Sequence, residues 1–382
     1  MKSSLTQLFI SFLKLGATAF GGPAMVAYIR RMAVDKKKWL DNETFQKGIA
    51  LCQSIPGATA MQMAAYVGFK CRRGLGAVAS FVGFGLPAFI IMLVLSALYA
   101  QGHNLPIVVS IFKGLQVIII AIVVTAVVSF AKTSLKDWKD VTVVAIAGLL
   151  FWAKVNPVIV ILLSALFGLV LYRKRAYRQV AASEAQRFPI RGFLLTVLGI
   201  LAVGIFVLFV GDRRLFNLSI LMLRIDLFAF GGGFASLPIM YHEVVEVRSW
   251  IDAPTFLNGI ALGQVTPGPI VITATFIGYM IHGVSGAIIA TLSIFLPSLL
   301  LVIVTVPYFD RFQSSPYFNR AITGIFASFV GLLLTVAVRF ALDVTWNIQG
   351  VLLAAAALVA LLLKVEIIWV VLVGVVISAL FF

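Results

Sequence analysis

The chain has 382 residues, of which 62% are hydrophobic and only 12% are charged. Soluble domains average about half apolar and about a quarter charged residues, so this composition excludes an ordinary soluble domain. The chain carries 30 Lys and Arg against 14 Asp and Glu, a formal net charge of +16. On a chain with apolar runs of about 15 to 25 residues, this excess indicates cytoplasmic loops and anionic membrane lipid rather than nucleic acid. We therefore expect an all-α polytopic membrane protein.

An internal repeat with a period of about 210 residues covers nearly the whole chain. The segment from Trp39 to Gly57 aligns with the segment from Trp250 to Gly268, and eleven of the nineteen positions are identical. Shared hydrophobicity alone does not give this identity. We expect a first repeat at 1–172, a basic linker with one extra transmembrane helix at 173–211, and a second repeat at 212–382.

Each copy is interrupted twice by glycine and proline at matched positions. Inside hydrocarbon the freed backbone groups must be satisfied, so such breaks survive only within protein or around a wet cavity. A helix that restarts after a break points unpaired N–H groups and a positive dipole end into that cavity. We expect four such N-termini to converge on an anion, although a packing kink remains an alternative. The breaks are Gly21-Gly22-Pro23 with Gly231-Gly232-Gly233, and Pro56-Gly57 with Pro267-Gly268-Pro269.

Charged and polar side chains at membrane depth suggest the same anion site. Lys14 and Arg224 occupy equivalent repeat positions shortly before the first break. A buried cation costs roughly a few kcal/mol, so a matched pair suggests a bound anion or a fixed partner; snorkelling to the interface is the alternative. Asp226 is the candidate for proton coupling, unless it simply lies on another face. We also expect donors from Gln53, Gln264 and Thr266.

The positions of Lys and Arg predict how the segments are oriented. We place the basic linker in the cytoplasm and alternate outward along the apolar runs. The loops at 30–38, 70–73 and 132–139 then lie inside, and the loops at 101–105 and 242–252 lie outside. On this count about 20 of the 30 basic residues lie inside and about five outside. The extra helix inverts the second copy, which is the usual architecture of secondary transporters. We expect about 10–13 membrane segments, with broken or re-entrant helices.

These residues give the chain its resemblance to the chromate ion transporter family in the long, two-domain form. The resemblance implies a secondary transporter that moves chromate out of the cell, with sulfate as the isosteric competitor. It also implies the plasma (inner) membrane of a bacterium or archaeon, and often a homodimer. Two departures concern Ala58, where the family has proline, and the region of Tyr28, where a histidine often occurs. The motifs are Phe20-Gly-Gly-Pro23 with Trp39, Ile55-Pro-Gly57 with Tyr66-Val-Gly68, Phe230-Gly-Gly-Gly233, Thr266-Pro-Gly-Pro269 with Phe276-Ile-Gly-Tyr279, and Ile294-Phe-Leu-Pro297.

From these features we expect a secondary active transporter of tetrahedral oxyanions, an antiporter that works by alternating access, with protons as a candidate coupling ion. A sulfate or other anion permease, or a channel, is the first alternative. An intramembrane enzyme acting on lipid phosphate is the second, but such enzymes usually carry paired acids for Mg²⁺, and Asp226 stands alone. With two cysteines and no nucleotide-binding loop or metal-ligand spacing, we expect no cofactor, no metal and no enzyme activity.

Overall fold

The computed structural model describes residues 3–20, 24–173, 191–309 and 315–382, and every regular element within them is a helix. Four helical segments are long and apolar enough to cross a membrane by length and composition. This confirms the prediction of an all-α polytopic membrane protein. The long segments are α4 (Thr59–Gly102), α5 (Pro106–Ser134), the run of η3 (Ile270–Ile272), α12 (Thr273–Thr305) and η4 (Val306–Tyr308), and α14 (Pro316–Asp343).

The same order of helices occurs in both halves of the chain. In the first half these are α1 (Leu5–Thr18), α2 (Ala24–Arg30) with the π-helix η1 (Arg31–Lys36), α3 (Asn42–Ser54), α4, α5, α6 (Trp138–Trp152) and α7 (Pro157–Leu171). In the second half they are α9 (Arg213–Phe228), α10 (Gly233–Tyr241) with the π-helix η2 (His242–Val247), α11 (Ala253–Val265), η3 with α12, α14, α15 (Ile348–Leu362) and α16 (Ile367–Phe381). Between the halves lies α8 (Arg191–Gly211), which packs on α9.

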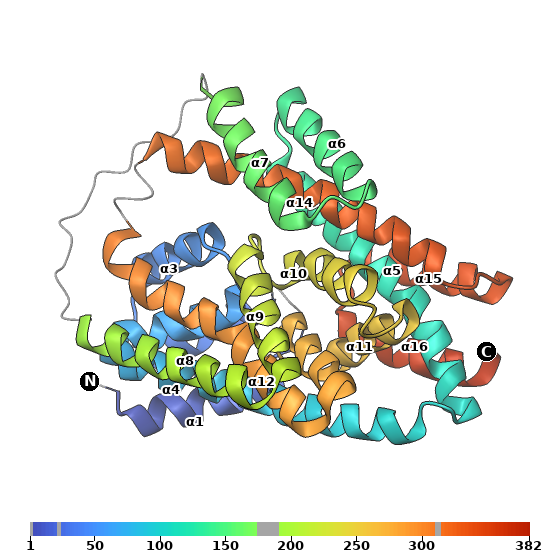
Figure 1. Cartoon of the computed structure of the whole chain (residues 1–382), viewed down its shortest axis with the longest axis horizontal. Coiled ribbons are helices and arrows are strands. Elements are labelled where there is room, and N and C mark those ends of the chain that lie inside the picture. Colours follow the sequence, from blue (N-terminus) through green and yellow to red (C-terminus); the bar gives the residue numbers. More distant parts are fainter. Residues whose placement is uncertain (1–2, 21–23, 174–190, 310–314) are drawn as a thin grey trace.

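The two halves exchange their C-terminal helices. The pair α6 and α7 packs on α14 of the second half, and the pair α15 and α16 packs on α5 of the first half. Figure 1 shows α6 and α7 lying along α14 at the top of the molecule. Towards the N-terminal side of each half, α1 packs on α4, α9 packs on α12, and α4 contacts α12. Each half therefore depends on the other for its neighbours.

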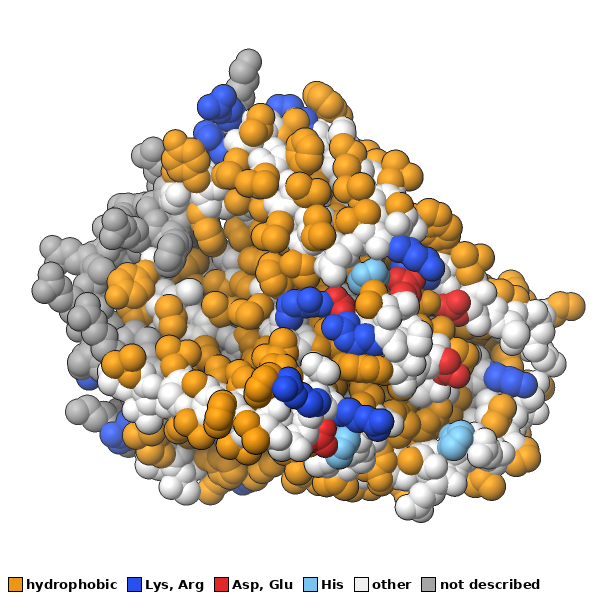
Figure 2. Space-filling model, in the orientation of Figure 1, with side chains coloured by type: hydrophobic (Ala, Val, Ile, Leu, Met, Phe, Trp, Pro, Cys, Tyr) orange, Lys and Arg blue, Asp and Glu red, His pale blue; other side chains and the backbone are white. Residues whose placement is uncertain are grey.

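Hydrophobic side chains on the outer face indicate contact with lipid. On α8, the side chains of Leu198, Ile200, Val203 and Phe206 are exposed. In Figure 2 hydrophobic side chains cover most of the face shown, while charged side chains gather in a strip across its middle. A soluble protein rarely exposes a continuous apolar surface of this extent. The exposed apolar helices thus face hydrocarbon.

In each half, a short helix and the first part of the helix that follows it form a hairpin, and a Pro-Gly break lies at its tip. The arms are α3 with the first part of α4, and α11 with the first part of α12. The Tyr66 hydroxyl on α4 donates to the Thr44 carbonyl on α3 at 3.0 Å, so the two arms run side by side. In the second half Gly259 on α11 lies against the ring of Phe276 on α12. Helices α3 and α11 have 13 residues each, about 20 Å of helix. Because the hydrocarbon core is about 30 Å thick, neither helix is long enough to span it alone.

The second arm of each hairpin reverses sharply into a longer helix. In α4 the reversal is at Arg72 and Arg73, and in α12 it is at His282 and Gly283. Small residues let the two limbs touch: a side chain at Gly278 would collide with the Gly286 carbonyl oxygen. Close backbone approach through small residues is the usual way in which helices associate in membranes.

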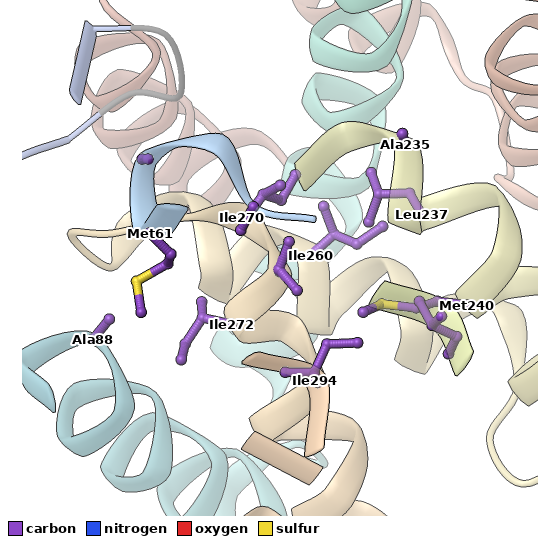
Figure 3. Close-up of a cluster of buried hydrophobic side chains, with 14 of the residues drawn as sticks. Met61, Ala88, Ala235, Leu237, Met240, Ile260, Ile270, Ile272 and Ile294 are labelled. Atoms are coloured by element: carbon purple, nitrogen blue, oxygen red, sulfur yellow. The ribbon is translucent and has the colours of Figure 1, made fainter. Parts of the chain in front are cut away.

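Buried hydrophobic side chains hold the tips of the hairpins in place. Figure 3 shows Met61 of α4 and Ala88 facing the residues that follow the second tip, Ile270 and Ile272. Leu237 and Met240 of α10 lie near Ile260 and Ile294 in the same cluster. All of these side chains are less than 9% exposed. The tips are therefore packed in a dry core on one side.

We expect Gly278→Ala to destabilise the protein, because the new methyl group must push the Gly286 backbone away. Overpacking of this kind costs about 1–3 kcal/mol. Gly204→Ala on α8 is the matched control, since nothing lies within 4 Å of its added carbon atom. The thermal midpoint in detergent should fall by several degrees for Gly278→Ala only. Equal midpoints for both variants would contradict the close contact.

Candidate functional site

The tip of each hairpin is bonded to the break of the opposite half. The Gly57 N–H donates to the Ala229 carbonyl at 2.9 Å, and the Gly268 N–H donates to the Ala19 carbonyl at 3.0 Å. Both glycines have positive φ, +119° and +111°, which L-residues with side chains rarely adopt. These bonds satisfy backbone groups that no water can reach in hydrocarbon. The Gly57 and Gly268 N–H groups are thus occupied structurally, and only the residues that follow them can offer free N–H groups to an anion.

We call the region where each hairpin tip meets the break of the opposite half the junction. At the junction of Gly57 with Ala229, Ser298 makes a second link that has no equivalent at the other tip. Ser298 of α12 accepts a hydrogen bond from the Ala58 N–H at 3.0 Å. Its hydroxyl and its own N–H both donate to Asp226 Oδ2, each at 2.8 Å. The equivalent positions in the first half are Ala88 and Gly16, which cannot make this link. Asp226 is therefore connected through one hydroxyl to the start of α4.

Two buried oxygens at this junction have no hydrogen-bond partner among the described residues. They are Asp226 Oδ1 and Gln62 Oε1. The amide nitrogen of Gln62 donates to the Pro56 carbonyl at 2.5 Å. Both side chains are 0% exposed. Unpartnered buried polar atoms are costly, so this junction has spare capacity for a proton or another donor.

We predict that Ser298→Ala weakens the junction, because it leaves the Ala58 N–H without its acceptor and removes one donor to Asp226. The loss of a buried hydrogen-bond partner costs about 1–3 kcal/mol. Alanine fits sterically, as Ala88 shows at the equivalent position. Ser96→Ala is the control, since its buried hydroxyl bonds only to Met92 in its own helix. A thermal midpoint as low for Ser96→Ala as for Ser298→Ala would refute the special role of the link.

A cavity of about 930 Å³ lies next to this junction. It separates α2 and α3 of the first half from α5 and α14, and the first residues of α4 and α10 face it. Its polar side chains are Arg30, Gln53, Thr59, Ser129, Thr133, Ser134, Lys136 and Thr323. The described residues that line it include no Asp or Glu. Arg30 is paired at 3.4 Å with Asp35, which does not belong to the lining. The lining itself is rich in hydroxyl groups and carries basic side chains.

Two helix N-termini meet at this cavity without a side-chain cap. The residues before α4 and α10, Ala58 and Gly232, provide no capping side chain. The two N-termini are adjacent, since a carbon atom added to Gly232 would lie 3.1 Å from Thr59 Oγ1. First-turn N–H groups have no partner within their own helix, and the helix dipole adds partial positive charge there. Uncapped N-termini of this kind bind anions.

The structure brings five of the predicted site residues to the cavity. They are Gln53, Gly231, Gly232, Gly233 and Pro269. The predicted residues Gly21, Gly22 and Pro23 lie outside the described residues, although Met25, Val26 and Ala27 directly after them line the cavity.

Other predicted residues near the tips have different surroundings. Pro56, Gly57, Pro267 and Gly268 are buried in the junction. Thr266 donates its hydroxyl to the Gly263 carbonyl of its own helix at 3.0 Å. The Gln264 amide nitrogen is buried without a partner among the described residues, and it does not line the cavity.

The structure does not bring the two predicted cations together at the cavity. Lys14 is exposed, because α1 buries the face of Phe12 and Gly16, and a residue two positions away points to the opposite side. Arg224 forms an ion pair with Glu243. Neither residue lines the cavity. Equivalent positions in the sequence therefore do not share one binding site here.

Sequence reasoning missed the two cations that do line the cavity. Arg30 and Lys136 lie in loops and helix ends that the charge count used only to set orientation. One usable signal was Ser129 and Thr133, which lie four residues apart and so share a face of α5. Hydroxyl groups on such a face can donate hydrogen bonds to an anion.

Comparison with known proteins identifies the family. The sequence pattern of the family described as "Chromate transporter" matches residues 6–169 and 216–379. The chain belongs to the chromate transporter family. Two matched segments of equal length also agree with the repeat in the sequence.

Similar proteins cover nearly the full length of the chain. An uncharacterized transporter of Methanocaldococcus jannaschii is 43% identical over 98% of this chain and 94% of its own length. The chromate transport protein of Cupriavidus metallidurans is 30% identical over 94% of this chain and 88% of its own length. A probable chromate transport protein of Synechococcus elongatus is 29% identical over 86% of this chain and 82% of its own length. No solved structure matches the chain.

Proposed function

We propose that the chain is a secondary active transporter that exports a tetrahedral oxyanion, chromate or a sulfate-like dianion, across the cell membrane. The observation that carries this proposal is the cavity, where two uncapped helix N-termini meet Lys136 and Arg30 and no acid belongs to the lining. Arg30 keeps a contact with Asp35 beside the lining. Helix N-termini bind oxyanions through backbone N–H groups. The names of relatives in Cupriavidus and Synechococcus support chromate as the first anion to test.

Part of the cavity lining belongs to segments that the charge count assigns to the cytoplasm. Arg30 and Lys136 line the cavity, and both belong to loops or helix ends predicted inside. An anion would enter there from the cytoplasm and bind near Thr59 and Gly233. The two halves, related as inverted repeats, would then move against each other to open the other side. This sequence of events is alternating access in the export direction.

Asp226 is the group best placed to carry a coupling proton. Among the described residues Asp140, Asp226 and Glu243 are the buried acids. Asp140 bonds to the Tyr172 hydroxyl and to backbone N–H groups, and Glu243 is paired with arginine. Asp226 has one oxygen with no partner. A carboxylate removed from water is costly unless it is paired or protonated, so a proton arriving at Asp226 is readily held.

The basic test of the proposal is flux in proteoliposomes. Saturable uptake of labelled sulfate and of chromate, driven by a pH gradient or membrane potential and inhibited by the other anion, is the expected result. Counterflow separates a carrier from a channel. The absence of flux for both anions would refute the proposed substrate class.

We predict that Arg30→Ala and Lys136→Ala raise the KM for sulfate by a factor on the order of ten each, since each removes a charge that attracts a dianion. Lys132→Ala is the matched control, because Lys132 is exposed on the same end of α5 but does not line the cavity. Initial rates over a range of sulfate concentrations give KM. An equal change for Lys132→Ala would mean that surface charge, not the cavity, is responsible.

We predict that Asp226→Asn uncouples anion movement from the pH gradient, because an amide cannot bind and release the proton. Sulfate binding to the purified variant should persist, and flux should no longer respond to an imposed pH gradient. Asp252→Asn is the control, as Asp252 only caps α11 through the Thr255 N–H. A variant Asp226→Asn with an undiminished response to pH would remove this residue from the coupling step.

A further inference from the structure

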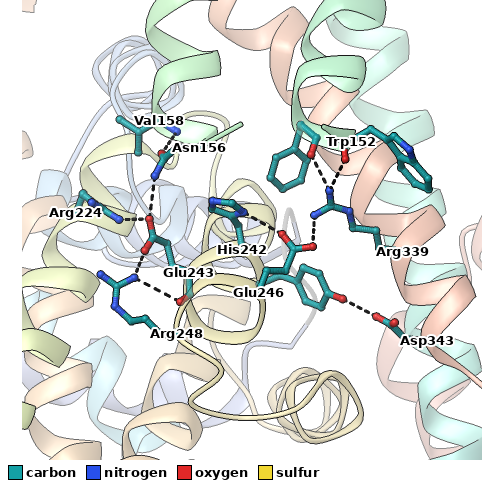
Figure 4. A network of polar contacts seen from close by, with 12 residues as sticks. Trp152, Asn156, Val158, Arg224, His242, Glu243, Glu246, Arg248, Arg339 and Asp343 are labelled. Carbon is teal, nitrogen blue, oxygen red and sulfur yellow. Dashed lines mark hydrogen bonds and ion pairs between the residues drawn. The ribbon is translucent and has the colours of Figure 1, made fainter. Parts of the chain in front are cut away.

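A buried carboxylate is held by two arginines on the side of the molecule opposite to the cavity. Glu243 of η2 is paired with Arg224 of α9 through one oxygen and with Arg248 through the other. The Glu243 side chain is only 2% exposed, whereas the two arginines are 38% and 31% exposed. Asn156 also donates to Glu243 at 3.2 Å. Figure 4 shows these groups converging on the one carboxylate.

A second branch of the same network ties η2 to α14 and to the end of α6. Glu246 contacts the His242 ring at 2.9 Å and forms an ion pair with Arg339 of α14. Arg339 in turn donates to the Phe151 carbonyl at 2.7 Å. The Tyr241 hydroxyl donates to Asp343 at 2.6 Å. These bonds close the space between α10 and α14 (Figure 4).

The equivalent positions in the first half line the open cavity. Tyr241 corresponds to Arg30, Arg339 to Ser129 and Asp343 to Thr133 in the repeat, and all three counterparts are cavity residues. Lys136 lies just before α6 and Trp152 ends it, so the open and closed regions are at opposite ends of that helix. Its 15 residues span roughly 20 Å. The network therefore lies where the second half would have an opening equivalent to the cavity of the first half. We call this place the second mouth.

We propose that Arg224 and Arg248 form a second oxyanion site at this mouth, and that the Glu243 carboxylate fills it as an internal stand-in while the mouth is closed. The proposal rests on the proposed function and adds a site to it. Two guanidinium groups suit a dianion, because each can donate in parallel to two oxygens. Arg224 Nε is buried without a partner among the described residues, so one donor of the pair is still available.

Exchange between the carboxylate and the anion explains how binding would open the mouth. Because Glu243 is buried and the arginines are partly exposed, an anion on the arginines requires the Glu243 side chain to leave them. Arg248 directly follows η2, so the start of η2 that carries Glu243 moves relative to Arg224. The anion then stabilises the open state, since it binds only where Glu243 has left. When the anion departs, Glu243 returns to the two cations and closes the mouth.

The test uses a cysteine behind the network and a variant that weakens its centre. In a background where Cys52 and Cys71 are alanine, Val244→Cys places the thiol at a position that is 0% exposed. Adding Glu243→Gln should raise its rate of reaction with a membrane-impermeant maleimide by a factor on the order of ten, a typical coupling between a site and a conformational state. Val247→Cys, 57% exposed, should react equally fast in both backgrounds.

Binding of labelled sulfate to purified protein tests the site itself. Glu243→Gln should bind sulfate on the order of tenfold more tightly than the parent, because the internal competitor is gone. Adding Arg248→Ala should abolish the gain, whereas adding Arg213→Ala should preserve it, since Arg213 lies over the Phe209 ring. If Glu243→Gln is not monodisperse on gel filtration, Glu243→Asp, which keeps the charge and retracts it, should give smaller changes in the same directions.

The outcomes separate this site from the proposed function. Unchanged labelling or unchanged sulfate affinity in a folded Glu243 variant, with parental flux intact, would overturn the second site alone. Faster labelling without tighter sulfate binding would likewise overturn the oxyanion site. Absence of sulfate and chromate flux in the parent protein would instead overturn the proposed function.

Discussion

The structure depends on one constraint, that backbone groups freed inside hydrocarbon must find partners within the protein. Helices that stop at Pro-Gly and Gly-Gly breaks leave such groups at the ends of short hairpins. Each tip is completed by a carbonyl of the opposite half, Ala229 for Gly57 and Ala19 for Gly268. The positions of the helix N-termini at the cavity, and hence its positive potential, follow from these two bonds.

The two halves contain the same order of helices, but the space beside α2 and α3 differs from the equivalent space beside α10. On the side of α2 and α3 there is a cavity with hydroxyl groups and two cations. On the side of α10, arginine and glutamate pairs fill the equivalent space. A transporter that opens one side at a time needs this kind of inequality. In this protein the difference between the two sides lies in their side chains.

Much of the fold could be predicted from the sequence, because its signals are local. Repeated motifs marked the two halves, apolar runs marked the helices, and paired glycine or proline residues marked the three breaks that lie within the described residues. The site was harder to predict. The matched cations Lys14 and Arg224 face different surroundings, since spacing in a repeat does not fix the face of a helix. Arg30 and Lys136 escaped notice because which of the two sides is open is a property of the assembled molecule.

The exchange of bonds between halves also governs the order in which the chain can mature during synthesis. Gly57 precedes its partner Ala229 by about 170 residues, which at a typical elongation rate means a delay of roughly 10 to 30 s. Throughout that interval the Gly57 N–H lacks the acceptor that it has in the finished protein. Correct insertion of the first half is therefore decided late, by residues that have yet to be made.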